Sequence, residues 1–168
     1  MNRVIVRLAV FALFLALAAV PVTAQQAWTA VGSTGAVDEA SLGLYATNIS
    51  SLGFQPAPTG TVFARYNVTN AFGGGFTDTP PWNTLEMTYF DNAATSNVTA
   101  ILYKVDRCTG TVTTICGMSS VDNASNTCQT CNFAAGAINF ATSNYVVEVR
   151  VSRSTNAVNP QLIALRIF

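Results

Sequence analysis

The sequence contains no histidine and only one lysine, Lys104. Histidine is the usual general base of Ser-His-Asp and Cys-His catalysis and a frequent metal ligand, so those mechanisms are excluded in their usual form. A phosphate-binding loop is also missing, because the glycine run "FGGGF" is followed by neither a lysine nor a helical pattern. We therefore predict that the protein is not an enzyme and binds no cofactor.

Charge is scarce, since only 10% of the residues are charged and the formal net charge is zero. Without Arg3 and Arg7 of the N-terminal segment, six basic and eight acidic residues remain, a net charge of −2. Binding to nucleic acid or to an anionic membrane surface needs clustered lysine and arginine, and the sequence has no such cluster. We therefore predict no nucleic-acid partner and no electrostatic attachment to a membrane.

The N-terminal segment has the pattern of a secretory signal peptide. Two arginines accompany an almost wholly apolar run, 4–20, and Val22-Thr23-Ala24 offers small residues at the cleavage positions. We predict that residues 1–24 are removed and that 25–168 form one mature domain without a membrane span. An uncleaved membrane anchor is the alternative, but the small-residue exit favours cleavage. The prediction is a secreted protein, extracellular or periplasmic and of bacterial origin.

Alternation of apolar and polar residues is the recurrent pattern in the mature chain, and this period of two indicates β-strands. It is clear in the segments 61–69, 84–91, 144–152 and 161–168, and weaker in 27–31, 42–49, 98–106, 111–118 and 137–141. No helical run of useful length is present. The sequence predicts an all-β protein, an antiparallel β-sandwich of eight or nine short strands with a jelly-roll or Ig-like path.

Four cysteines lie in one short region, and in an exported protein an even number of cysteines indicates disulfides. We favour the local pairing, Cys108–Cys116 and Cys128–Cys131, because the first pair flanks a hairpin and the second closes a turn. If a tight turn starts a new strand at Thr111, Cys116 lies roughly 16 Å along the hairpin, and the nested pairing Cys108–Cys131 with Cys116–Cys128 follows. The crossed pairing, Cys108–Cys128 with Cys116–Cys131, is the third arrangement.

The segment "CQTC" also has the spacing of a redox motif or of half a zinc site. The redox motif normally opens a helix, and a zinc site prefers a second short cysteine spacing. Neither feature is present, so structural disulfides are favoured.

The stretch "NAFGGGFTDTPPWN", residues 70–83, is predicted to be a loop rich in aromatic side chains. Aromatic rings stack on sugar rings and amides bond sugar hydroxyls, so we predict a ligand surface in this loop. Its candidate residues are Asn70, Phe72, Phe76, Asp78, Trp82 and Asn83. The alternative is that these rings fold back and cover one end of the core.

Acidic residues and asparagines supply two further hypotheses. Glu86 and Glu148 lie on the polar faces of their strands and could share a groove as a catalytic carboxylate pair. Asp122, Asn123 and Asn126 could bind calcium from a loop, although such residues are also common in turns. We predict neither catalysis nor a metal, and keep both as alternatives.

The function predicted from the sequence is a secreted, non-catalytic binding module for carbohydrate or a cell-surface partner. The first alternative is a structural or self-associating surface protein, such as a matrix, coat or filament subunit. In that alternative the segment "LIALRIF" is an exposed strand that pairs with a neighbouring molecule. The second alternative is a small glycan-active enzyme that uses paired carboxylates.

Overall fold

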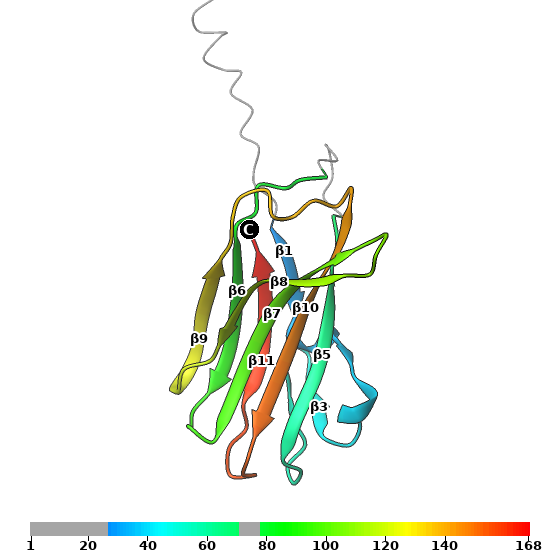
Figure 1. Cartoon of the computed structure of the whole chain (residues 1–168). Helices are drawn as coiled ribbons and strands as arrows, with labels where there is room; N and C mark the ends of the chain where they lie inside the picture. The colour runs from blue at the N-terminus through cyan, green and yellow to red at the C-terminus, as the bar shows by residue number, and fades with distance from the viewer. Residues whose placement is uncertain (1–26, 71–77) are drawn as a thin grey trace, which may run out of the picture.

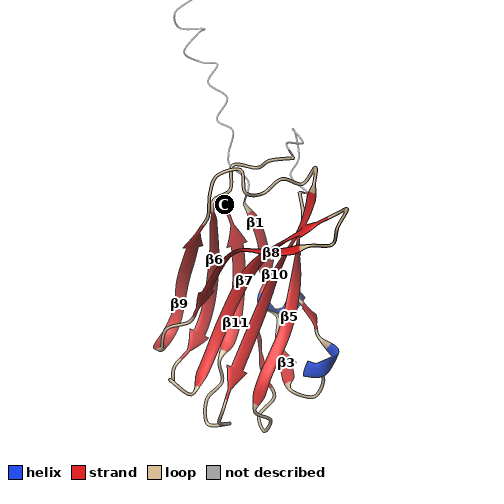
Figure 2. Cartoon of the chain, viewed as in Figure 1, coloured by secondary structure: helices blue, strands red, loops and turns tan. Residues whose placement is uncertain are grey.

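Two antiparallel β-sheets pack face to face in the computed structural model, which describes residues 27–70 and 78–168 (Figure 1, Figure 2). The predicted signal peptide lies outside these ranges. Within them no helix has the length and apolar character needed to cross a membrane. The elements are β1 (Trp28–Val31), η1 (Gly32–Thr34), β2 (Ala36–Val37), η2 (Glu39–Ser41), β3 (Tyr45–Thr47), β4 (Leu52–Phe54), β5 (Gly60–Val68), β6 (Thr84–Asp91), β7 (Ser96–Asp106), β8 (Val112–Ser119), β9 (Asn123–Asn132), β10 (Ser143–Arg153) and β11 (Gln161–Ile167).

The strand order is that of a jelly roll. Sheet A has the order β3-β4-β11-β6-β9, with β1 also paired to β11, and sheet B has the order β2-β5-β10-β7-β8. From β4 onward the first strand pairs with the last, β4 with β11, and then β5 with β10, β6 with β9 and β7 with β8. This nested pairing, divided between two sheets, confirms the predicted sandwich and identifies its path as the jelly roll.

Alternation along the strands builds the core between the sheets. In β10 the residues Val147, Val149 and Val151 are fully buried, while Glu148 and Arg150 between them face outward. The same pattern recurs in β5 and β7, which flank β10 in sheet B, and in β6 of the facing sheet A. Each buried aliphatic side chain contributes about 1.5–3 kcal/mol to the stability of the fold.

Three observed strands were not predicted from the sequence, and one predicted strand is absent. β2 and β4 are two and three residues long, too short to show a period, and β9 is almost entirely polar. The predicted strand 137–141 is wrong, because this segment belongs to the β9–β10 loop and places Ile138 and Phe140 against the core. The described residues therefore contain eleven strands rather than eight or nine.

The segment "LIALRIF" is an interior strand. β11 is hydrogen-bonded to β6 on one side and to β4 and β1 on the other. Its edges are therefore occupied, so the pairing with a neighbouring molecule that belonged to the alternative hypothesis is wrong.

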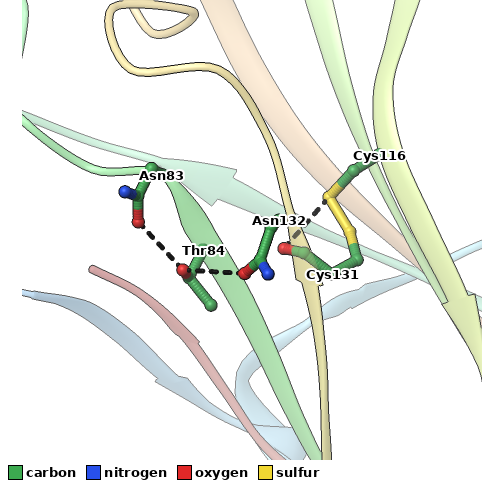
Figure 3. The surroundings of a disulfide bond; sticks show 5 residues. All are labelled: Asn83, Thr84, Cys116, Cys131 and Asn132. Atoms are coloured by element: carbon green, nitrogen blue, oxygen red, sulfur yellow. Dashed lines mark hydrogen bonds between the residues drawn. A yellow bond between two sulfur atoms is a disulfide. The ribbon is translucent and has the colours of Figure 1, made fainter.

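A disulfide between Cys116 and Cys131 joins β8 of sheet B to β9 of sheet A, with Cα atoms 6.2 Å apart (Figure 3). Both the local and the nested pairings are therefore wrong. The local pairing fails because Cys116 lies in the middle of β8, and Cys131 lies in a strand of the opposite sheet. Of the crossed pairing only this half is formed, since Cys108 and Cys128 are exposed free thiols.

Cys128 and Cys131 point to opposite sides of β9. Cys131 pairs with Leu85, whose side chain is fully buried, whereas Cys128 pairs with the outward-facing Thr88. The Cys128 sulfur lies 3.3 Å from the Thr88 hydroxyl oxygen. The "CQTC" segment is therefore a strand, in a geometry that suits neither a redox motif nor a zinc site.

Candidate functional site

Trp82, in the described part of the predicted aromatic loop, covers one end of the core. Trp82 is 1% exposed and meets Phe140 edge-on, with ring centroids 6.2 Å apart. Phe140 in turn contacts Tyr145 of β10, with centroids 5.2 Å apart. The predicted ligand platform is therefore wrong for Trp82, which forms the core cover of the alternative hypothesis. Phe72 and Phe76 lie outside the described residues.

The polar candidates of the same loop connect segments of the chain. The backbone N–H of Asn83 donates to the carbonyl of Phe168, and its side chain lies beside Thr84 (Figure 3). The Asp78 carbonyl accepts a hydrogen bond of 2.6 Å from the backbone N–H of Phe140 in the β9–β10 loop. Asn70 is half-buried at the end of β5. Asn83 and the Asp78 backbone thus hold the end of the sandwich together.

A groove of about 720 Å³ lies at the edge of the sandwich where β1 of sheet A meets β5 of sheet B. We call it the edge groove. It continues over the outer face of sheet A across β11 and β6. Its lining residues are Trp28, Thr29, Ala30, Val31, Thr34, Ala36, Arg65, Tyr66, Asn67, Glu86, Thr88, Ala164, Leu165 and Arg166.

Polar side chains of the edge groove form a row across three strands. Thr29 of β1, Arg166 of β11 and Glu86 of β6 are direct cross-strand neighbours. Thr88 lies on the same face, two residues after Glu86. The guanidinium of Arg166 lies 4.4 Å from the centre of the Phe168 ring, a cation–π contact that orients the arginine. The row therefore places hydroxyl, guanidinium and carboxylate groups side by side.

The floor of the edge groove is fixed by Tyr66. Its hydroxyl donates a hydrogen bond of 2.5 Å to the carbonyl of Gly32, at the turn between β1 and β2. Burial raises the pKa of Tyr66 above its usual value, so the hydroxyl stays a donor. A Cβ on Gly32 would lie 2.2 Å from the carbonyl oxygen of Leu162, so only glycine fits there. This end of the groove is therefore rigidly built.

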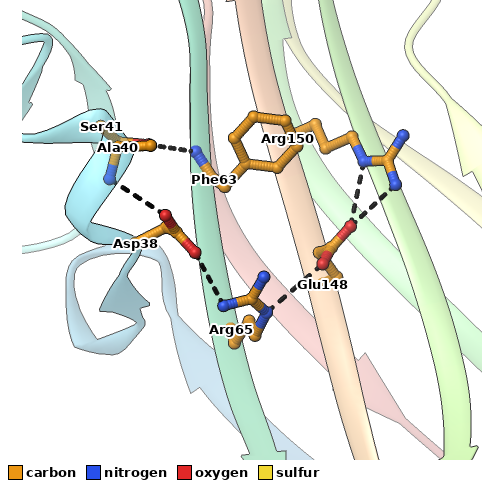
Figure 4. Close-up of polar contacts among 7 residues, drawn as sticks. All are labelled: Asp38, Ala40, Ser41, Phe63, Arg65, Glu148 and Arg150. Atoms are coloured by element: carbon orange, nitrogen blue, oxygen red, sulfur yellow. Dashed lines mark hydrogen bonds and ion pairs between the residues drawn. The ribbon is translucent and has the colours of Figure 1, made fainter.

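Arg65, on the β5 wall of the groove, belongs to a charged network on sheet B (Figure 4). It donates to Asp38 at 2.9 Å and to Glu148 at 3.3 Å, and Glu148 also pairs with Arg150 at 2.9 Å. The pKa of Asp38 is lowered first by the backbone N–H of Ala40 and then by Arg65. The charge of Arg65 is therefore largely balanced before any ligand binds.

The carboxylates proposed for catalysis are separated. Glu86 faces outward from sheet A and Glu148 faces outward from sheet B, so the hypothesis that they share one groove is wrong. Asp91 is 1% exposed and accepts hydrogen bonds from the hydroxyls of Ser96 and Ser120. It acts as a structural connection between the β6–β7 and β8–β9 turns.

The calcium candidates do not lie in one loop. β9 begins at Asn123, so Asn123 and Asn126 belong to a strand, and only Asp122 precedes it. The side-chain oxygen of Asn123 accepts a hydrogen bond of 3.1 Å from the backbone N–H of Ser125. Across 27–70 and 78–168, no group of three or more His, Cys, Asp and Glu side chains could hold a metal.

No protein-family model and no curated protein matches the chain. Among solved structures, the xylan-binding module CBM15 is similar, with a TM-score of 0.51 at 12% identity over 86% of this chain and 96% of the module. Carbohydrate-binding module CBM36, in complex with calcium and xylotriose, gives a TM-score of 0.46 at 8% identity over 84% of this chain and 99% of that one. The insecticidal crystal protein Cry2Aa gives 0.46 at 12% identity, over 84% and 21%. At these identities the likeness concerns the fold alone.

Reasoning from the sequence missed the edge groove. Alternation correctly placed Glu86 on an outer face and predicted that Asn67 and Arg166 point away from the core. Their assembly depends on the order of β1, β11 and β6 in sheet A, which alternation does not encode. A row of outward polar residues in each strand was the available signal.

Proposed function

We propose that the protein is a non-catalytic carbohydrate-binding module and that the edge groove holds the sugar chain. The observation that carries this proposal is the row formed by Thr29, Arg166 and Glu86 on the groove wall. The fold likeness to a xylan-binding module supports the same class of function. Export is part of the proposal, since the signal-peptide pattern and the Cys116–Cys131 disulfide both suit an oxidising compartment.

The polar row matches the chemistry of neighbouring sugar hydroxyls. Each hydroxyl both donates and accepts, and cross-strand neighbours place their Cβ atoms about 5 Å apart. Glu86 accepts hydrogen bonds and Arg166 donates them. Of two neighbouring sugar hydroxyls, one can therefore donate to Glu86 while the other accepts from Arg166. Thr29, Thr88 and Asn67 add groups that do both. Such a site is selective for the orientation of hydroxyls rather than for charge.

Apolar groups complete the site. The exposed Val31 and the half-buried Ala30 and Ala164 line the groove beside the polar row. They offer contact surface to the C–H groups of a sugar ring, which are as apolar as the alanine and valine methyls. The combination of a few directed polar groups with apolar surface is typical of a ligand site.

The proposal is tested by affinity electrophoresis in gels that contain xylan, mixed-linkage β-glucan, galactan or starch, followed by calorimetry with the matching oligosaccharides. We expect retardation by at least one of these polysaccharides. Glu86→Gln and Thr88→Ala should each weaken binding about tenfold, because the first replaces an accepting carboxylate oxygen by an amide donor and the second leaves a sugar hydroxyl without a partner.

Thr47→Ala is the matched control for Thr88→Ala, since Thr47 is an exposed threonine of β3 that does not line the groove. It should bind as the wild type does. Absence of binding to the whole polysaccharide panel, or equal affinity of the Glu86 and Thr47 variants, would contradict the proposal.

A further inference from the structure

Two cross-strand rows lead from the edge groove over the outer face of sheet B. The groove residue Asn67 is followed by Val146 of β10 and Tyr103 of β7. The groove residue Arg65 is followed by Glu148 and Ile101 on the same two strands, as the registers show. The groove and the outer face of sheet B are therefore continuous through β5.

Tyr103 differs from the three buried tyrosines of the sandwich, and also from Tyr45 of β3, whose ring packs against the core. The hydroxyls of Tyr66, Tyr89 and Tyr145 each bond a backbone carbonyl. Tyr103 is half-buried, and among the described residues its hydroxyl has no hydrogen-bond partner and its ring no aromatic or cation contact. Phe63 on the same face is covered by the guanidinium of Arg150, 5.6 Å from the ring centre. The Tyr103 ring is therefore available to a ligand.

We propose that Tyr103, Val146 and Ile101, here called the Tyr103 surface, continue the edge groove and bind the same sugar chain beyond it. The proposal rests on the proposed function and makes its ligand an extended polysaccharide rather than a short saccharide. Two strand spacings, about 10 Å, separate Tyr103 from Asn67, a distance that a few sugar residues cover. One sugar ring stacks on Tyr103, with its hydroxyls toward the polar neighbours.

The composition of this face favours a carbohydrate over a protein partner. The apolar part comprises Tyr103, Val146 and Ile101 and, next to Tyr103, Val105 with its exposed cross-strand neighbour Val112. Polar groups flank it, namely Asn67 and the balanced pair of Arg65 and Glu148. Gly117 lies opposite Ile101 in β8, so no side chain rises beside Ile101, and Thr114 lies opposite Tyr103 and adds a hydroxyl.

The test is calorimetry with oligosaccharides of increasing length, from disaccharide to hexasaccharide, cut from the polysaccharide that binds the wild type best. Wild-type affinity should rise with length until the chain reaches the Tyr103 surface. Tyr103→Ala should bind the disaccharide as the wild type does and the hexasaccharide about tenfold more weakly. Tyr103→Phe should retain the gain, and Tyr103→Leu should lose it, because stacking needs the ring and not the hydroxyl.

The outcomes separate the two proposals. If the disaccharide binds and Thr88→Ala weakens it, but Tyr103→Ala leaves the hexasaccharide affinity unchanged, the edge groove stands and the Tyr103 surface is refuted. A loss for Tyr103→Ala that is equal at all lengths also refutes it, since that loss would reflect the fold. If no carbohydrate binds the wild type, the proposed function is wrong and this inference is wrong with it.

Discussion

Cys116 of β8 and Cys131 of β9 join the edge strand of one sheet to the edge strand of the other. At the opposite edge the main chain itself crosses between the sheets, from β1 through η1 to β2. The sandwich is thus closed by backbone at one edge and by a disulfide at the other. Fifteen positions separate the two cysteines in the sequence.

Removing this disulfide should destabilise the fold. A disulfide that closes a loop of that length restricts the conformations of the unfolded chain. The folded state is thereby stabilised relative to the unfolded one by about 3 kcal/mol. We expect the double variant Cys116→Ser, Cys131→Ser to lose about this much in urea unfolding. The matched control is Cys108→Ser, Cys128→Ser, which removes two exposed free thiols and should change little. Equal stability of the two double variants would contradict the prediction.

Trp82→Ala should act on stability rather than on ligand binding. The side chain is 1% exposed and packs on Phe140, so truncation leaves a cavity that costs about 3–5 kcal/mol. Thermal unfolding measures the loss. Calorimetry well below the transition should find the carbohydrate affinity of the folded variant unchanged. A stable variant with weakened binding would instead show that Trp82 belongs to the ligand site.

Arg153 holds two loops at the other end of the sandwich. It is 4% exposed, and its guanidinium donates to the carbonyls of Pro58, at 2.7 Å and 3.0 Å, and of Val158, at 2.7 Å. Arg153→Ala leaves these half-buried acceptors without their donor and should cost about 2–4 kcal/mol in urea unfolding. Arg153→Lys should recover little, because an ammonium cannot reach several carbonyls at once. Full recovery by lysine would contradict this account.

The stability of the β7–β8 turn should depend on the protonation of Asp106 at acid pH. Its carboxylate accepts from the backbone N–H of Thr109 at 2.8 Å and of Cys108 at 3.0 Å. These bonds, the Thr109 N–H first, lower its pKa below 3.8, its value without these interactions. A carboxyl with a lowered folded pKa stabilises the turn above that value and loses its effect as pH falls through the folded pKa.

An NMR titration should therefore give an Asp106 midpoint below 3.8. The protection factors of the turn amides, which correct for the intrinsic pH dependence of exchange, should fall as the carboxylate is protonated. In Asp106→Asn the exchange of these amides should no longer respond to this titration. A midpoint at or above 3.8 in the wild type would refute the assignment.

The fold was predictable from side-chain alternation wherever a strand has one wet face. β5, β6, β10 and β11 were found in this way, because their inward residues are apolar and their outward residues polar. β9 was missed since both faces of its first half are exposed, so its sequence resembles a loop. The segment 137–141 was wrongly predicted to be a strand, because a loop that covers the core can be as apolar as a strand.

The candidate site was less predictable than the fold. Trp82 was correctly placed in an end loop, but sequence alone left its exposure open, and packing against Phe140 decides it. The disulfide partner of Cys116 lies in the other sheet, a relation that depends on strand order rather than on spacing. Residues of the edge groove come from five strands, and no local pattern links Thr29 to Glu86.

The nested pairing of the jelly roll also sets the order of assembly. β10 and β11 are the last strands along the chain, yet β10 lies between β5 and β7, and β11 lies between β4 and β6. Neither sheet can form its central pairs until these two strands are available. The strands before them therefore stay without a core, and exposed to aggregation, until β10 and β11 join, and the domain then folds late and as a whole.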